Sequence, residues 1–576
     1  MSAATATGQV PMPRAAGAAP AVEVKLGPGW GWTTWQVADA TVSLKGWLLD
    51  GGRSLEGEKA AAYAARVIGA APDDGKLKSV LAQLAGHFAL MVRTPGRLVA
   101  CVDRIRSCPL MWAHAGGTTF IDDRGRRLRD KLGLGLDDLD AEQALACATG
   151  GWTIGSATLY RGLRMLRAGE ALVVDAAGPR ALRWFIYDAW NTEPLERPEQ
   201  RLSELHRRMI ERLAASADGR AICVPLSAGL DSRMIAAGLR AVGYRDVRLF
   251  SYGRLGNHEA ETARQIAERL GYPWTFVPFS GSMQRALFAD SAHERALWQE
   301  ADTCGCFPFE QDWLAISALK KSGWISPDAV IVNGQSGDFI TGNHVPSALV
   351  DGAAVGAAES RDRVYAAYIG KHHSLWGALS GAAIRRRIEA LLDDEAAAAG
   401  AAFGRDAPHG IYEFLEGQDR QSKYVVSGQR TYEALDLKWR LPLWDDDYML
   451  FWRRAPLELK VRQNLYRRVL ESDNWGDVWR DVPVNAKTIR PRWIVPLRLA
   501  AKLALAPSGR DRWHRAEKRL FGWWMDPLRI SAFISYSQAL ADNRQPRHAG
   551  AWLTERYLAQ HGVAVNQFVR ADAGAL

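Results

Sequence analysis

The residues best suited to chemistry lie in a turn between an apolar segment and a helical pattern. Residues 221–226 form an apolar run of strand length, and Ser227-Ala228-Gly229-Leu230-Asp231-Ser232 follows it, before a helical pattern that starts at Arg233. Such a turn directs backbone N–H groups, two hydroxyls and a helix dipole at one point, which suits a di- or triphosphate. Asp231, the one anion there, fits as a ligand of Mg²⁺ bound to the same phosphates. The turn predicts an ATP site, although a simple capped turn has the same composition.

A second turn of the same kind follows a later apolar strand. Residues 329–332 lead into Asn333-Gly334-Gln335-Ser336-Gly337-Asp338, which again places small residues and one carboxylate after a strand. Ligands of doubly wound sheets bind at the carboxyl ends of the strands, so Asp338 is expected to face Asp231 across the crevice. The alternative is an ordinary turn rich in Gly and Asp.

The elements that must hold these turns are those of a parallel sheet. From residue 198 to about residue 441, helical and strand patterns alternate. Residues 247–252 form a strand ending in Ser251-Tyr252-Gly253, and residues 274–279 form the next strand. From about residue 22 to residue 188, short strands, turns and helical stretches predict an α+β region. The chain therefore combines an α+β part with an α/β part.

The composition sets limits on the class of protein. The chain has 576 residues, which predicts two or more domains, and its 48% apolar and 24% charged residues are typical of globular proteins. A net charge of +9 favours anionic partners. Among these partners we do not expect nucleic acid. No apolar run reaches the length of a transmembrane helix. Six cysteines form no disulfide framework, so we expect a reducing, cytoplasmic compartment; they are Cys101, Cys108, Cys147, Cys223, Cys304 and Cys306.

The order of several motifs resembles the class B, glutamine-hydrolysing asparagine synthetase family. The first turn is similar to the Ser-Gly-Gly-x-Asp-Ser loop of enzymes that cleave ATP between its α and β phosphates. The second is similar to the family's Ser-Gly-x-Gly-Ala-Asp-Glu stretch. Four upstream segments are similar to the family's glutaminase domain: Gly86-His87-Phe88-Ala89, Asp103-Arg104, Gly151-Trp152-Thr153-Ile154-Gly155 and Leu166-Arg167-Ala168-Gly169-Glu170. The resemblance covers roughly residues 22–493.

This resemblance implies two domains with different folds. Residues 22–190 would be a degenerate glutamine amidotransferase type 2-like domain with an Ntn-hydrolase-like sandwich. Residues 198–500 would be an asparagine synthetase-like ATP-pyrophosphatase domain with a parallel sheet, of the adenine nucleotide alpha hydrolase-like class. We expect residues 1–21 to form a disordered tail and residues 501–576 a helical extension.

The resemblance also implies roles for single residues. Asp231 and Asp338 would bind Mg²⁺. Lys487 lies where the family has a lysine over the reaction centre, which would stabilise charge that develops in the transition state, although a surface lysine is an equal alternative. ATP would be held by residues at the ends of three strands: Leu226, Ser227, Gly229, Asp231, Ser232, Ser251, Gly253 and Gly334.

Three positions depart from the family pattern. Ala228 replaces the first of two glycines in the phosphate loop, which a negative φ would tolerate. Phe339 replaces a glutamate that helps to place the acceptor, which argues against plain asparagine synthesis. Ser2 stands where the family exposes a cysteine nucleophile, and it opens a flexible tail. The first cysteine, Cys101, is expected in the core, so the glutaminase domain is expected to lack its chemistry.

The sequence therefore predicts ATP-dependent amide-bond formation through an acyl-adenylate, on a carboxylate acceptor other than aspartate, such as a sugar acid or a peptide. Ammonia, an amine or a separate glutaminase would supply the nitrogen. Three alternatives remain: asparagine synthesis itself, a non-catalytic nucleotide-binding protein, and a sulfur-transfer or tRNA-modifying enzyme, for which Cys304 and Cys306 are the only support.

A basic segment near the C-terminus is not explained by this chemistry. Residues 490–520 are rich in arginine and lysine and are interleaved with Trp493, Trp513 and aliphatic residues. Two interpretations are open: peripheral contact with a membrane surface or an acidic glycan, or a solvated helical face.

Overall fold

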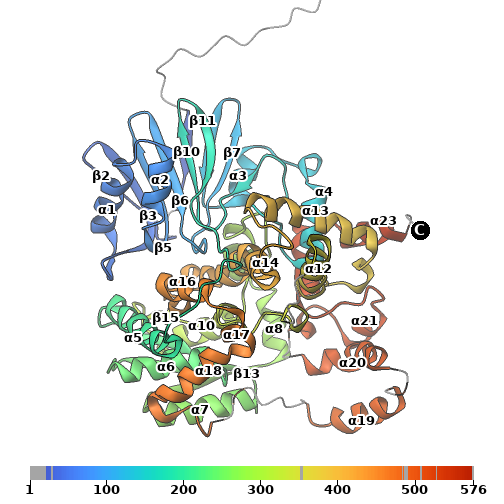
Figure 1. The fold of residues 1–576 in the computed structure, drawn as a ribbon. Coiled ribbons are helices and arrows are strands. Elements are labelled where there is room, and N and C mark those ends of the chain that lie inside the picture. The colour runs from blue at the N-terminus through green and yellow to red at the C-terminus, as the bar shows by residue number, and fades with distance from the viewer. Residues whose placement is uncertain are drawn as a thin grey trace, which may run out of the picture.

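The computed structural model describes residues 21–27, 30–350, 355–482, 484, 491–505, 507, 509–526 and 529–573. Three sheets organise this part of the chain, two of them from the N-terminal third and one from the middle (Figure 1). A mixed α/β architecture with a parallel sheet is confirmed.

The larger N-terminal sheet is antiparallel, and helices cover one of its faces. The pleat sends Leu90 and Val92 of one strand towards helices α1 (Gly57–Gly69) and α2 (Asp74–Leu81), and the alternating Met91 towards the opposite core. The strand order is β11-β10-β6-β5-β3-β2 with β4 beside β3, and the strands are β2 (Thr33–Val37), β3 (Ala40–Asp50), β4 (Arg53–Leu55), β5 (Ala85–Thr94), β6 (Arg97–Val102), β10 (Glu170–Asp175) and β11 (Gly178–Arg183).

Cys101 confirms the expectation of a core residue. It lies in β6 and is fully buried on the helix-covered face of the sheet. Burial raises the pKa of this thiol far above its usual range, so Cys101 is not a nucleophile.

The second N-terminal sheet has the strand order β1-β8-β7-β9. Its first pair is parallel and the other pairs are antiparallel. The strands are β1 (Val22–Lys25), β7 (Met111–Ala115), β8 (Thr118–Asp122) and β9 (Arg164–Met165).

The five-stranded sheet is entirely parallel, with the order β14-β13-β12-β15-β16. From the central strand β12 the chain first adds β13 and β14 on one side and then β15 and β16 on the other. The gap between β12 and β15 is therefore a topological switch point. Helices α5 (Pro198–Ala217), α6 (Leu230–Ala241) and α7 (His258–Leu270) alternate with its strands, which are β12 (Ile222–Pro225), β13 (Val247–Arg254), β14 (Trp274–Phe279), β15 (Val330–Val332) and β16 (Lys438–Arg440).

One helix boundary differs from the prediction. Helix α6 begins at Leu230 after the extended N-cap Gly229, and not at Arg233. The polar residues Asp231 and Ser232 are therefore in its first turn, where carboxylate and hydroxyl groups are compatible with the free N–H groups of a helix. The apolar pattern did not predict this turn, because the buried Ser232 and Arg233 separate the buried Leu230 from the apolar residues that follow.

Helices complete the C-terminal half. The last helices return to the N-terminal third, where α22 (Gly550–Gln560) packs against α4 (Ala141–Gly150). Tyr557 of α22 also donates from its Oη to Asp302 at 2.9 Å, which ties this helix to the middle of the chain. The helices of this half include α10 (Trp313–Lys321), α12 (Ala357–His372), α13 (Ala382–Ala398), α14 (Pro408–Leu415), the π-helix η5 (Glu416–Val425), α16 (Asp446–Arg454), α18 (Asn464–Asp473), α19 (Ile494–Leu505), α20 (Arg510–Met525), α21 (Tyr536–Ala541), α22 (Gly550–Gln560) and α23 (Val565–Ala573).

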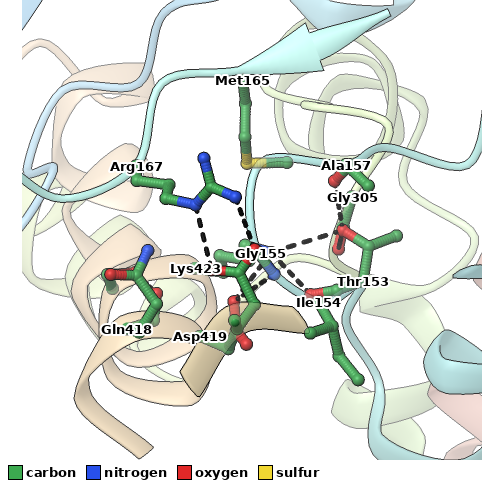
Figure 2. A network of polar contacts seen from close by, with 12 residues as sticks. Thr153, Ile154, Gly155, Ala157, Met165, Arg167, Gly305, Gln418, Asp419 and Lys423 are labelled. Carbon is green, nitrogen blue, oxygen red and sulfur yellow. Dashed lines mark hydrogen bonds and ion pairs between the residues drawn. The ribbon is translucent and has the colours of Figure 1, made fainter. Parts of the chain in front are cut away.

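The segment 151–155 binds the π-helix η5 through buried charges (Figure 2). Lys423 Nζ donates to Thr153 O at 2.6 Å and pairs with Asp419 at 2.9 Å, while the Gly155 N–H donates to the same carboxylate at 3.0 Å. An added Cβ at Gly155, whose φ is +68°, would lie 2.0 Å from Glu395 Oε1. These residues join the two halves of the chain. The contacts between the halves explain the backbone conformation of the segment 151–155 without any role in catalysis.

A second buried contact between the halves centres on Asp446 in the first turn of α16. Arg104 Nη1 donates to its carboxylate at 2.6 Å and the Gly86 N–H donates at 2.7 Å. Both glutaminase-like segments that begin at Gly86 and Asp103 thus contact the α/β part of the chain.

We expect Asp446→Ala to lower the free energy of unfolding by about 3 kcal/mol, because it leaves the buried Arg104 guanidinium unpaired. The neighbouring Asp447→Ala is the matched control: it also removes a first-turn carboxylate paired with an arginine, but Asp447 is 49% exposed, so the loss should stay below about 1 kcal/mol. Urea unfolding of both variants measures the difference, and equal losses would contradict the role of this interface.

Candidate functional site

The two predicted turns meet at the carboxyl ends of β12 and β15, at the switch point of the parallel sheet. An added Cβ at Gly334 would lie 2.7 Å from Ser232 N, and one at Gly337 would lie 2.2 Å from Asp231 Cγ. The second turn therefore packs its glycines directly against the first turn of α6. This contact brings the Asp231 and Asp338 segments together, as the sequence predicted.

Hydroxyl groups order the first turn from within. Ser232 Oγ accepts a hydrogen bond from Ser227 N at 3.1 Å, and Ser227 Oγ accepts one from Gly229 N at 3.1 Å. Ala228 is buried and its φ is not positive, so its methyl group is accommodated without strain. The turn keeps its conformation with alanine in place of glycine.

Asp231 is the electrostatic centre of the site. Its carboxylate accepts a hydrogen bond from Tyr466 Oη in α18 at 3.2 Å, and one from the backbone of Asp338. Burial, reinforced by the negative charge of Asp338, raises the pKa of Asp231 to about 8. The raised pKa shows that the negative charge of Asp231 is poorly compensated by the protein. A divalent metal ion bound between Asp231 and Asp338 would supply that compensation.

Asp338 is exposed at this edge, as a metal ligand shared with a nucleotide would need to be. Asn343 Nδ2 donates to its Oδ1 at 3.2 Å, and Asn343 N donates to its carbonyl at 2.9 Å. The short helix α11 (Gly337–Ile340) carries Asp338, and Ser336 before it has a positive φ of 68°. The turn thus aims Asp338 towards the first loop.

Ser251 and Gly253, which the sequence predicts to hold ATP, lie at the end of the neighbouring strand β13. Ser251 Oγ donates to Leu226 O at 2.6 Å and accepts from Trp274 Nε1 at 3.1 Å, so this hydroxyl fixes the end of β12. Gly253 lies near the end of β13, with a φ of 126° that favours glycine. The structure places these residues on the same sheet edge as the two turns.

Arg233 is a residue that the motif analysis did not single out. It is fully buried in α6, donates to Ala228 O in the first turn at 2.7 Å, and donates to Val478 O at 3.0 Å and Val482 O at 3.1 Å. It therefore ties the phosphate-loop turn to the segment that leads towards Lys487. Lys487 itself and Ser2 lie outside the described residues.

A cluster of basic side chains surrounds the buried carboxylate of Glu416 beside the second turn. His344 Nδ1 lies 2.5 Å from Glu416 Oε1, Arg420 Nη1 donates at 3.1 Å and Lys371 Nζ lies at 3.8 Å. Ser336 joins this cluster to the second turn by donating to Gln421 at 2.7 Å. Arg420 and Gln421 share the π-helix η5 with Glu416, whereas His344, Lys371 and Ser336 come from separate elements, so no local sequence pattern connects them to it.

Phe339 is buried among aromatic rings at the boundary between the two halves. Its ring centroid lies 5.9 Å from both Tyr187 and Trp444, and the residue is 1% exposed. The apolar ring is therefore part of the core, and its position contributes no polar group to an acceptor.

Cys304 and Cys306 are buried, and neither has the character of a reactive thiol. Burial raises the pKa of Cys306 to about 12 and raises the pKa of Cys304 well above its usual range. Cys304 lies beside Asp302 and His561, a grouping that could hold a metal ion, but Asp302 already accepts from Tyr557 and from Cys304 N and pairs with His561 at 3.1 Å. The grouping is explained as a hydrogen-bonded core network.

Comparison with protein families identifies the part of the chain that forms this site. The asparagine synthase family matches residues 209–472. This match confirms the resemblance for residues 209–472 and supports an ATP-dependent enzyme that forms carbon–nitrogen bonds. A search of curated proteins finds no match.

Two solved structures are similar over part of their length. Glutamine phosphoribosylpyrophosphate amidotransferase from B. subtilis, complexed with ADP and GMP, shares 12% identity, with 42% of this chain and 72% of that chain covered and a TM-score of 0.19. The allosteric regulatory enzyme of purine biosynthesis shares 12% identity over 43% of this chain and 62% of that chain, with a TM-score of 0.18. Scores this low carry no argument about fold or function. Among the described residues, no helix is long and apolar enough to cross a membrane.

We expect Gly337→Ala to weaken MgATP binding by at least about 10-fold, because the new methyl group would displace the Asp231 carboxylate from its position. Gly370→Ala is the matched control, since a Cβ there meets no heavy atom within 4 Å. Isothermal titration calorimetry measures both affinities. Unchanged affinity in Gly337→Ala would separate Asp231 from the nucleotide site.

Proposed function

We propose that this chain activates a substrate carboxylate as its acyl-adenylate and converts it into an amide. The observation that carries the proposal is the meeting of two glycine-rich turns at the switch point of a parallel sheet, with the half-buried Asp231 between them. The match of residues 209–472 with the asparagine synthase family supports it.

The substrate carboxylate would attack the α-phosphorus of ATP and release pyrophosphate. An amine or ammonia would then attack the acyl carbon, forming the amide and releasing AMP. Ser227, Gly229 and Ser232 would hold the phosphates, while Leu226, Ser251, Gly253 and Gly334 would border the nucleotide. Mg²⁺ bound by Asp231 and Asp338 would neutralise the leaving pyrophosphate. Lys487 would stabilise the charge that develops at the reaction centre.

The nature of the acceptor follows from the residues beside Asp338. Phe339 is buried in the core, while His344, Lys371 and Arg420 gather around Glu416 next to the same turn. This cationic surrounding favours an anionic acceptor larger than aspartate, such as a sugar acid or a peptide carboxylate. Asparagine synthesis itself is the nearest alternative.

We also propose that residues 22–190 form a degenerate, Ntn-hydrolase-like glutaminase domain. Glutamine hydrolysis by such a domain needs a nucleophile, and Cys101 is buried in the sheet. The segments that resemble a glutaminase instead hold the α/β part through Asp446 and Asp419. The domain would thus act as a structural platform.

Two other functions have less support. A sulfur-transfer enzyme needs reactive thiols, and burial holds both Cys304 and Cys306 in their protonated form. A non-catalytic nucleotide-binding protein would follow from a distorted phosphate loop, and the backbone of Ala228 is unstrained.

The reaction class is tested by exchange of labelled pyrophosphate into ATP in the presence of candidate carboxylic acids. We expect exchange with the correct acid, and its loss by at least about 100-fold in Asp231→Ala and in Asp338→Ala, because each removes a ligand of the metal that neutralises pyrophosphate. Asp447→Ala is the control, since this carboxylate lies outside the site and pairs with Arg212. Formation of ADP in place of AMP would contradict the proposal.

The nitrogen source gives a separate prediction. A nucleophile whose own α-amine accepts its proton must be both N-terminal and fixed in place, and Ser2 opens a tail rich in small residues. We expect the purified protein to release no glutamate from glutamine, and to turn over with ammonium if ammonia is the donor. Glutamate release that Ser2→Ala abolishes would show a working glutaminase.

A further inference from the structure

Helix α19 exposes an apolar surface that the proposed chemistry does not use. Trp493, just before the helix, is 52% exposed, and the leucines along it are more exposed still: 55% for Leu497, 56% for Leu499 and 70% for Leu503. Val495 adds a further 40% exposed side chain. These five residues, the α19 surface, make up most of the large apolar side chains exposed in the described part of the chain.

The opposite face of α19 is already packed against α20. Ile494 is fully buried in a small core with Trp513 and Phe521, and Ala501 and Leu505 pack against that core. Arg498 reinforces the pair by donating to Glu517 at 2.5 Å. The helix is thus apolar on both sides, and only one side is covered by the described chain. A helix that is apolar all round is stable in a folded protein when its remaining face is also removed from water.

Charge gathers at the same place. Residues 490–520 contain nine arginines and lysines and two acidic residues, a net charge of +7, whereas the whole chain has a net charge of +9. Lys502, Arg512 and Lys518 are exposed on the two helices. Most of the net positive charge of the chain is therefore carried by the sequence segment that contains the α19 surface.

We propose that the α19 surface binds the interface of a membrane that contains anionic lipids. Leucines and a tryptophan would enter the boundary between headgroups and acyl chains, while the surrounding arginines and lysines contact the anionic headgroups. This combination of apolar residues and basic flanks is typical of helices that lie in the plane of a membrane, and the length of α19 is too short to span one.

A second copy of the chain fits this surface less well. A helix of 12 residues is about 18 Å long and about 10 Å wide, so one of its faces covers about 180 Å². A stable interface between proteins buries roughly 800 Å² per partner, which is far more. Two copies would also bring their positive charges together. A polyanion such as RNA accounts for the basic residues but leaves the exposed leucines in water.

The α19 surface is connected to the candidate site through α20. Arg254, the last residue of β13, donates to Asp526 O at 2.9 Å and to Trp524 O at 3.4 Å at the end of α20. Figure 1 shows α19 and α20 at the edge of the molecule, far from the N-terminal sheets. Membrane binding would therefore hold the carboxyl edge of the parallel sheet near the lipid surface.

Flotation of the full-length protein with lipid vesicles tests the proposal. Vesicles of phosphatidylcholine with phosphatidylglycerol should capture the protein, and vesicles of phosphatidylcholine alone should capture much less. Changing Leu497, Leu499 and Leu503 together to Glu should weaken binding by at least about 100-fold. Leu136→Glu, at a leucine that is 65% exposed in the N-terminal part, is the matched control and should bind normally.

Charge is tested separately. Each of Lys502→Gln, Arg512→Gln and Lys518→Gln should weaken binding to the anionic vesicles by about fivefold. Circular dichroism of every variant checks that it is folded. Three results would overturn the proposal: no capture by anionic vesicles, normal capture of the triple glutamate variant, or a dimer of the wild-type chain that this variant dissociates.

Discussion

The candidate site is organised around one half-buried carboxylate that has no partner cation in the described part of the chain. Asp231 accepts hydrogen bonds from Tyr466 and from the backbone of Asp338, and no described arginine, lysine or histidine pairs with it. Removing a carboxylate from water without a cation is costly, which supports the proposal that a metal ion would bind beside it. The glycines of the second turn let that turn pack against the first turn of α6, next to this carboxylate.

The two halves of the chain share one core and are joined by buried ion pairs. Residues of β5 and β6 belong to the same apolar cluster as β12 and β15. Lys423 with Asp419 and Arg104 with Asp446 lie across the boundary. Because breaking a buried pair leaves an unpaired charge, the stability of each half depends on its contact with the other.

The π-helix η5 is the element through which these contacts reach the site. Its first residue, Glu416, contacts His344 and Arg420 beside the second turn, while Asp419 and Lys423 of the same helix bind Gly155 and Thr153 of the N-terminal part. A π-helix places side chains at angles that an α-helix does not, and such helices are frequent near functional sites. The cluster around Glu416 and the boundary between the two halves are therefore connected through one helix.

The sequence by itself determined the parallel sheet and the identity of both turns, because strand-length apolar runs followed by small residues and a carboxylate are local features. It also determined that Cys101 is a core residue. The tertiary structure decided which distant residues join them: Tyr466 on Asp231, Arg233 beneath the turn, and the cluster around Glu416. Apart from the pair of Glu416 with Arg420, which has i,i+4 spacing in one helix, those contacts depend on how separate elements pack. The exposure of the α19 leucines was likewise decided by the tertiary structure, because an apolar sequence does not specify whether other elements cover it.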